Sequence, residues 1–138
     1  MDAVKRMLVP GSVGGCVAAL TVALAVRDPH EAGSWGLCPF LALTGWQCPA
    51  CGGLRAVNDL THGDVIGALS SNLYFVVLFP VFAGLWVMWV RNSWQGRTFH
   101  LSRHTTRTVV YPLLAALLGL LVVFTVLRNT PSGAWLAP

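Results

Sequence analysis

The sequence has few charged residues, and three long stretches have none. Charged side chains make up 10% of the 138 residues and hydrophobic ones 55%, whereas about a quarter of a soluble domain is charged. The uncharged stretches are 7–26, 73–90 and 109–127. Each is close to the roughly 20 residues that a helix needs to cross a bilayer core. This scarcity of charge excludes an ordinary soluble domain and predicts three membrane spans.

A bilayer core offers backbone amides no water to bond, so spanning segments form helices. The sequence therefore predicts an all-α membrane protein: one integral membrane domain over 1–138 with three transmembrane helices. Pro80, in the middle of the second span, lacks an amide N–H and predicts a kink at that position. The first span is expected to stay uncleaved, because its apolar run is longer than that of a signal peptide.

Signatures of catalysis are also missing. The sequence has no serine elbow, no phosphate-binding loop and no paired carboxylates within the spans, which leaves no hydrolase site. Ion-coupled transporters usually carry charged groups inside the membrane, and these spans carry no charged residue. A non-catalytic role is therefore the favoured expectation.

The nine basic residues are unevenly distributed. Most precede the first span or lie between the second and third: Lys5, Arg6, Arg91, Arg97, Arg103 and Arg107. By the positive-inside rule, the N-terminus and the second loop are cytoplasmic, while the first loop and the C-terminus lie outside. The expected location is the cytoplasmic membrane, with lipid headgroups contacting the basic loop. No aromatic–basic motif supports nucleic-acid binding.

Small residues recur at every fourth position of the first span, at Gly11, Gly15, Ala19 and Ala23. Such a ridge lets another helix approach closely. It predicts contact either with the other spans of this chain, which we favour, or with a homo-oligomer or a larger membrane complex. Cys16 lies beside the ridge and is expected to act as a small buried apolar residue.

The first loop, residues 27–71, is too long for a simple connection. Cys48 and Cys51 form a C-x-x-C step directly before a helical pattern, where the helix N-terminus favours a thiolate. Gly63 matches a helix C-terminal glycine and Asp64 an N-cap. The loop is thus expected to contain two short interfacial helices separated at Gly63, the second running on toward the second span.

Two further segments carry weaker signals. Arg55 lies one turn after Cys51, and we assign it a structural role in bonding backbone carbonyls, with an ion pair to Asp59 as the competing interpretation. The C-terminal tail, residues 128–138, is rich in turn formers and is expected to be poorly ordered.

The motif C-P-F-x3-T-G-x2-C-P-x-C-G-x2-R-A, followed by H-G-D and an asparagine, resembles a family of small bacterial membrane proteins known only as domain of unknown function family 2752. The resemblance covers 38–72 and implies a membrane location but no activity. Leu54 and Leu73 depart from the family pattern, which usually has threonine and proline there. The positions expected to structure the loop are Pro39, Pro49, Gly52, Arg55, Gly63, Asp64 and Asn72.

Three interpretations of Cys38, Cys48 and Cys51 remain open. Thiols outside the cytoplasm tend to oxidise, so a structural disulfide would leave one cysteine over. Three thiolates at this spacing also approach a zinc site, for which His62 and His30 are the nearby nitrogen donors of a fourth ligand. Thiol–disulfide redox chemistry is the third interpretation, although the βαβ pattern of a thioredoxin-like domain is missing.

The leading expectation is an accessory or assembly subunit whose cysteine-stapled loop presents a rigid surface to a partner. The alternative is an extracytoplasmic metal-binding protein of zinc type, or a thiol-redox protein, that uses the same three cysteines.

Overall fold

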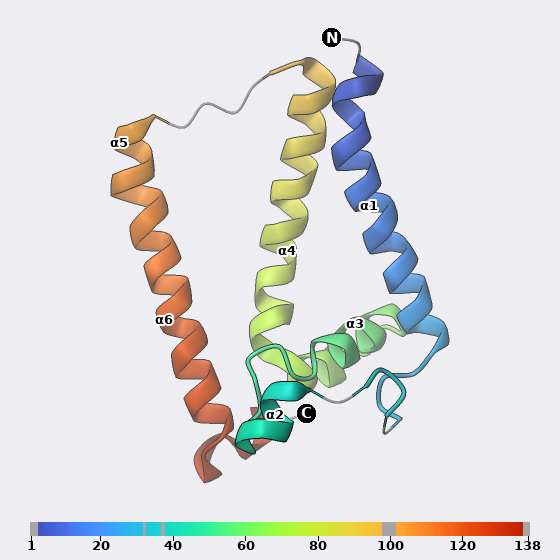
Figure 1. Cartoon of the computed structure of the whole chain (residues 1–138), viewed down its shortest axis with the longest axis vertical. Helices are drawn as coiled ribbons and strands as arrows, with labels where there is room; N and C mark the ends of the chain where they lie inside the picture. Colours follow the sequence, from blue (N-terminus) through green and yellow to red (C-terminus); the bar gives the residue numbers. More distant parts are fainter. Residues whose placement is uncertain (1–2, 32, 37, 98–101, 137–138) are drawn as a thin grey trace.

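The computed structural model describes residues 3–31, 33–36, 38–97 and 102–136, and no strand occurs among them. Three long helices dominate (Figure 1): α1 (Ala3–Val26), α4 (Val65–Gln95) and a continuous helical segment from Arg103 to Arg128. That last segment comprises α5 (Arg103–Thr105), a π-helical turn (Thr106–Val110) and α6 (Tyr111–Arg128). All three are long and apolar enough to cross a membrane, which confirms the predicted fold class.

Two short helices, α2 (Pro39–Thr44) and α3 (Gly53–Thr61), lie at one end of the long helices, close to the C-terminus (Figure 1). α3 ends before Gly63, whose φ is 78°. Asp64 then caps α4, because its Oδ1 accepts a hydrogen bond from the amide of Gly67 at 2.8 Å. The second predicted short helix is therefore the first part of α4, whereas α2 was not predicted.

The irregularity in α4 lies at Asn72 instead of Pro80. Asn72 has φ −160° and ψ 90°, and Pro80 lies within regular helix. Asn72 Oδ1 accepts a hydrogen bond from the amide of Phe75 at 2.9 Å, so Asn72 caps the helix that follows it. The break in helical backbone therefore lies eight residues before Pro80, the position at which the sequence predicts a kink, and an internal cap causes it.

α1 packs along α4 (Figure 1). Trp86 Nε1 donates to the carbonyl of Pro10 at 3.2 Å, and a Cβ added to Gly14 would meet the Trp86 ring at 2.5 Å. The predicted ridge of Gly11, Gly15, Ala19 and Ala23 does not make this contact, since its members are exposed. Pro10 and Gly14, each one position before a ridge residue, make the contact instead. Cys16, which was expected to be buried, is exposed as well.

α6 meets α4 near the end that carries α2 and α3. Tyr74 Oη donates to the carbonyl of Leu117 at 2.9 Å, and the Tyr74 ring stacks on Phe124 with centroids 5.8 Å apart. The tail expected to be poorly ordered forms a 3₁₀ helix, Pro131–Leu136, in which Gly133 and Leu136 are buried. Packing against α6 and α4, which turn-rich composition does not reveal, orders this segment.

Candidate metal centre

Three cysteines from two parts of the chain converge. Cys38 directly precedes α2, and Cys48 and Cys51 lie in the turn before α3. The Sγ of Cys48 is 3.5 Å from that of Cys38 and 2.9 Å from that of Cys51. All three sulfurs lie within 4.8 Å of one another, and all are free thiols. We call these three residues the cysteine cluster.

The local fold explains why the two cysteines of the C-x-x-C step face the same side. The amide of Cys51 donates to the carbonyl of Cys48 at 3.0 Å, and that of Gly53 to Ala50 at 2.9 Å. Gly52, with φ 80°, then turns the chain into α3. Left-handed backbone of this kind favours glycine. The turn thereby presents both sulfurs to one point.

α2 brings the third sulfur into place. Pro39 occupies its first turn, where a missing amide N–H costs no hydrogen bond. The helix ends at Gly45, whose φ is 71° and whose amide donates to the carbonyl of Leu41. This cap turns the chain back after α2, so that Cys48 lies near Cys38, with the two sulfurs 3.5 Å apart.

Asn72 holds the turn from α4. Its Nδ2 donates to the carbonyls of Pro49 at 2.9 Å and Cys51 at 3.1 Å, and the residue is 1% exposed. Its Oδ1 meanwhile caps the helix at Phe75. One buried amide therefore fixes both the cysteine turn and the start of the regular part of α4.

Arg128, the last residue of α6, also holds this turn. Its Nη1 donates to the carbonyls of Cys48 and Cys51, each at 3.1 Å. Asn129 exchanges two hydrogen bonds with the backbone of Gln47, one to its carbonyl at 3.0 Å and one from its amide at 2.8 Å. The end of the third long helix is thus fastened to the cysteine loop.

The thiols differ in acidity. The backbone amide of Leu41, followed by the Cys51 thiol, lowers the pKa of Cys38 to about 7. Burial raises the pKa of Cys51 to about 12, with the neighbouring thiols adding to the shift. Of these two thiols, Cys38 therefore ionises first.

Neither expected histidine belongs to the cluster. His30 lies between two carboxylates, with Nδ1 2.8 Å from Asp28 and Nε2 3.3 Å from Asp59. His62 Nδ1 is 2.9 Å from the carbonyl of Asn58 at the end of α3. Among the described residues, the cysteines alone form a group able to hold a metal ion.

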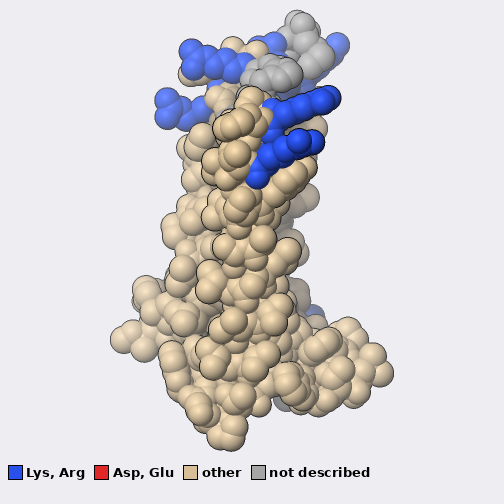
Figure 2. Space-filling model, turned by 90° about the vertical axis from the view of Figure 1, so that its left-hand side faces the viewer, with Lys and Arg blue, Asp and Glu red and all other residues tan. Residues whose placement is uncertain are grey.

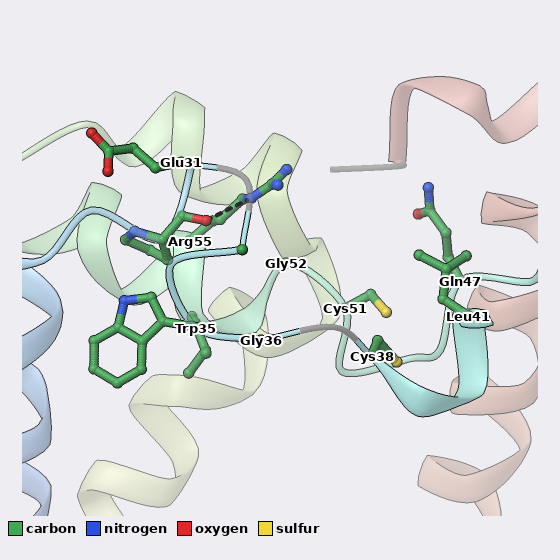
Figure 3. Close-up of a pocket in the computed structure, with 12 residues that line it drawn as sticks. Glu31, Trp35, Gly36, Cys38, Leu41, Gln47, Cys51, Gly52 and Arg55 are labelled. Carbon is green, nitrogen blue, oxygen red and sulfur yellow. Dashed lines mark hydrogen bonds between the residues drawn. The ribbon is translucent and has the colours of Figure 1, made fainter.

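A cavity of about 450 Å³ opens beside the cluster, and Cys38 and Cys51 line it together with Arg55 and Trp35 (Figure 3). Arg55 Nε donates to the carbonyl of Pro29 at 3.3 Å, so this arginine bonds a backbone carbonyl and makes no ion pair with Asp59 among the described contacts. The cavity gives solvent and small ligands a route to the sulfurs.

The sequence singled out neither Arg128 nor Asn129. An arginine closing an apolar run resembles an ordinary interfacial anchor, and the following asparagine resembles a turn residue. Arg128 and Asn129 are adjacent side-chain donors at the same end of the spans as the cysteines, and this pairing was the signal that could have indicated a contact with the cysteine loop.

Comparison with known proteins supports the resemblance found in the sequence. A family model described as "Protein of unknown function (DUF2752)" matches residues 38–86. The match contains the cysteine cluster, α3 and the first part of α4, and it supports the resemblance without adding an activity. No curated protein and no solved structure matches the chain.

Proposed function

We propose that this membrane protein holds a soft metal ion of zinc type between Cys38, Cys48 and Cys51. The family match names no activity, so the proposal rests on the geometry of the site. The convergence of three free sulfurs within 4.8 Å carries the proposal. Zinc is bound by thiolates at about 2.3 Å in tetrahedral geometry, which places the sulfurs about 3.8 Å apart. The Cys48 and Cys51 sulfurs are 2.9 Å apart and those of Cys38 and Cys48 3.5 Å, so each of these two pairs reaches that spacing by moving apart less than about 1 Å.

The fourth ligand in this proposal comes from outside the cluster. Three protein ligands with one open position are typical of zinc sites that bind water or a small molecule. The neighbouring cavity, which Cys38 and Cys51 line, supplies the access that such a ligand needs.

We place the cluster on the outer side of the cytoplasmic membrane. The described basic residues at the far end of the long helices stand out in the space-filling view (Figure 2). A basic end of this kind is retained in the cytoplasm, which leaves the cysteine cluster outside. In that compartment thiols tend to oxidise, and a bound metal would protect them.

The test is metal content of the full chain purified in detergent under reducing, chelator-free conditions. We expect about one zinc ion per chain for the parent and for Cys16→Ser, because Cys16 lies on α1 away from the cluster. Cys38→Ser, Cys48→Ser and Cys51→Ser should each lose most of it. An intact Cys48–Cys51 disulfide with one free cluster thiol and no metal would contradict the proposal.

A second candidate is an accessory or assembly subunit, which the exposed ridge of α1 favours. Gly11 and Gly15 have open space beside them, and Ala19 and Ala23 are exposed. Small-residue ridges pack other membrane helices closely. Cross-linking through Cys16 in a Cys38/Cys48/Cys51→Ser background tests this candidate. A cross-linked dimer would identify a second copy, and a larger adduct a different partner.

A further inference from the structure

The guanidinium of Arg128 is buried without a carboxylate partner. Arg128 is 2% exposed, and its Nε and Nη2 have no hydrogen-bond partner. The Phe124 ring lies 4.9 Å from its Cζ, and two carbonyls accept from its Nη1. The ion pairs among the described residues both belong to His30 instead. A buried charge is costly unless an opposite charge compensates it.

We propose that Arg128 is the counter-charge of the three-thiolate site. Its positive charge thereby selects a divalent metal ion as the ligand of that site. This inference rests on the proposed function. Three thiolates and a divalent ion carry one net negative charge, and the guanidinium neutralises it. The thiol protons leave for water as the metal binds, so no redox partner is required.

Two other candidate states leave a charge unbalanced. A disulfide whose remaining thiol is protonated is neutral, and Arg128 then stays uncompensated. A monovalent ion on three thiolates carries two negative charges, of which Arg128 balances one. In a low-dielectric environment such residual charge is expensive, so the buried guanidinium favours the divalent three-thiolate state over these two.

Nearby charged groups do not replace Arg128. Arg55 and Glu31 line the cavity beside the cluster and carry opposite charges. His30 is held by Asp28 and Asp59. Among the charged residues that the structure describes, Arg128 alone donates to the backbone carbonyls of both C-x-x-C cysteines, and it comes from the third long helix. It is a positioning residue, since it contacts the carbonyls of the ligands rather than the metal.

Cobalt(II) titration of the full chain tests the inference, because the sulfur-to-cobalt charge-transfer band reports thiolate ligation directly. Arg128→Met keeps the apolar stem and removes the charge. It should weaken cobalt binding about 10-fold to 100-fold, the usual effect of losing a group that supports the ligands, and lower the band per bound cobalt. Arg128→Lys, which retains the charge, should recover most of both. Circular dichroism checks the fold, and Arg128→Gln replaces the methionine variant if that variant does not fold.

A double-mutant cycle separates charge compensation from a purely structural role. Cys38→Ser binds the metal weakly, but cobalt titrated to high concentration still occupies its two remaining thiolates. Two thiolates and a divalent ion are already neutral, so adding Arg128→Met there should cost less than about threefold in affinity. Equal losses in both backgrounds would overturn the inference and leave the metal site standing. Unchanged cobalt binding in folded Arg128→Met would overturn it as well. A parent protein that binds no cobalt would instead overturn the proposed function.

Discussion

Arg128 Nη1 donates to the carbonyl oxygen of Cys51 at 3.1 Å, across 77 positions of sequence. Asn72 donates to the same oxygen from α4 at 3.1 Å. Two of the three long helices therefore hold the C-x-x-C turn directly. α1 joins the same end through Asn58 of α3, whose Nδ2 donates to the carbonyl of Leu24 at 2.7 Å. The cysteine cluster sits where the three helices are tied together, so its geometry depends on all of them.

Asn72→Ala should loosen the cysteine turn and destabilise the protein. The change leaves the carbonyl of Pro49 without its donor and removes the cap at Phe75. Loss of buried hydrogen bonds of this kind costs about 1–3 kcal/mol. Thermal unfolding in detergent measures the loss, with Ser70→Ala as the control, because Ser70 is exposed and bonds only within its own helix. Equal transition temperatures for the two variants would contradict the role given to Asn72.

Gly52→Ala should destabilise the turn through the backbone alone. The φ of 80° at this residue is left-handed, and forcing a Cβ into such backbone costs about 1–2 kcal/mol. Gly84→Ala is the matched control, because Gly84 lies within α4 with open space around it. We expect a lower unfolding temperature and weaker cobalt binding for Gly52→Ala only. A neutral result at both positions would count against the turn geometry.

Alkylation of the cluster should depend on pH in a residue-specific way. Because the pKa of Cys38 is lowered to about 7, the reactive thiolate is already the main form at pH 8. The pKa of Cys51 is raised to about 12, so this thiol stays protonated and slow between pH 6 and about 9. Iodoacetamide labelling of the metal-free protein, read by peptide mass spectrometry, should rise at Cys38 with a midpoint near pH 7. Faster labelling of Cys51 than of Cys38 at pH 7 would refute this order.

Gly14→Leu should disrupt the packing of α1 on α4, whereas Gly15→Leu should not. A Cβ at Gly14 meets the Trp86 ring, but Gly15 has nothing within 4 Å. Overpacking of this kind costs about 1–3 kcal/mol. Unfolding temperatures of the two variants in detergent compare the two faces of the helix. Greater damage from Gly15→Leu would show instead that the predicted ridge makes a contact more important than the one with Trp86.

The long helices and the local turns could be predicted from the sequence. Uncharged runs of spanning length predicted the three helices, and the Gly63–Asp64 pair predicted where α3 ends and α4 begins. These features are local: helix length, a left-handed glycine and a side-chain cap are all encoded within a few residues. The motif around Cys48 likewise predicted thiols placed directly before a helix.

Features that depend on tertiary packing escaped sequence reasoning. The small-residue ridge showed that α1 has a face suited to packing, but not that Pro10 and Gly14 would be the residues to meet Trp86. The contact of Arg128 with the cysteine turn spans about 80 positions, and no local pattern encodes it. The histidines within reach along the sequence, His30 and His62, are bonded elsewhere in space.

X-ray absorption spectroscopy at the zinc edge tests the central claim most directly, because it reports the atoms bound to the metal. For the reduced, zinc-loaded parent, we predict three sulfur ligands at about 2.3 Å and one lighter ligand. Cys16→Ser should give the same spectrum, and Cys51→Ser should lose a sulfur ligand or the metal altogether. A spectrum with only oxygen and nitrogen ligands would contradict the account.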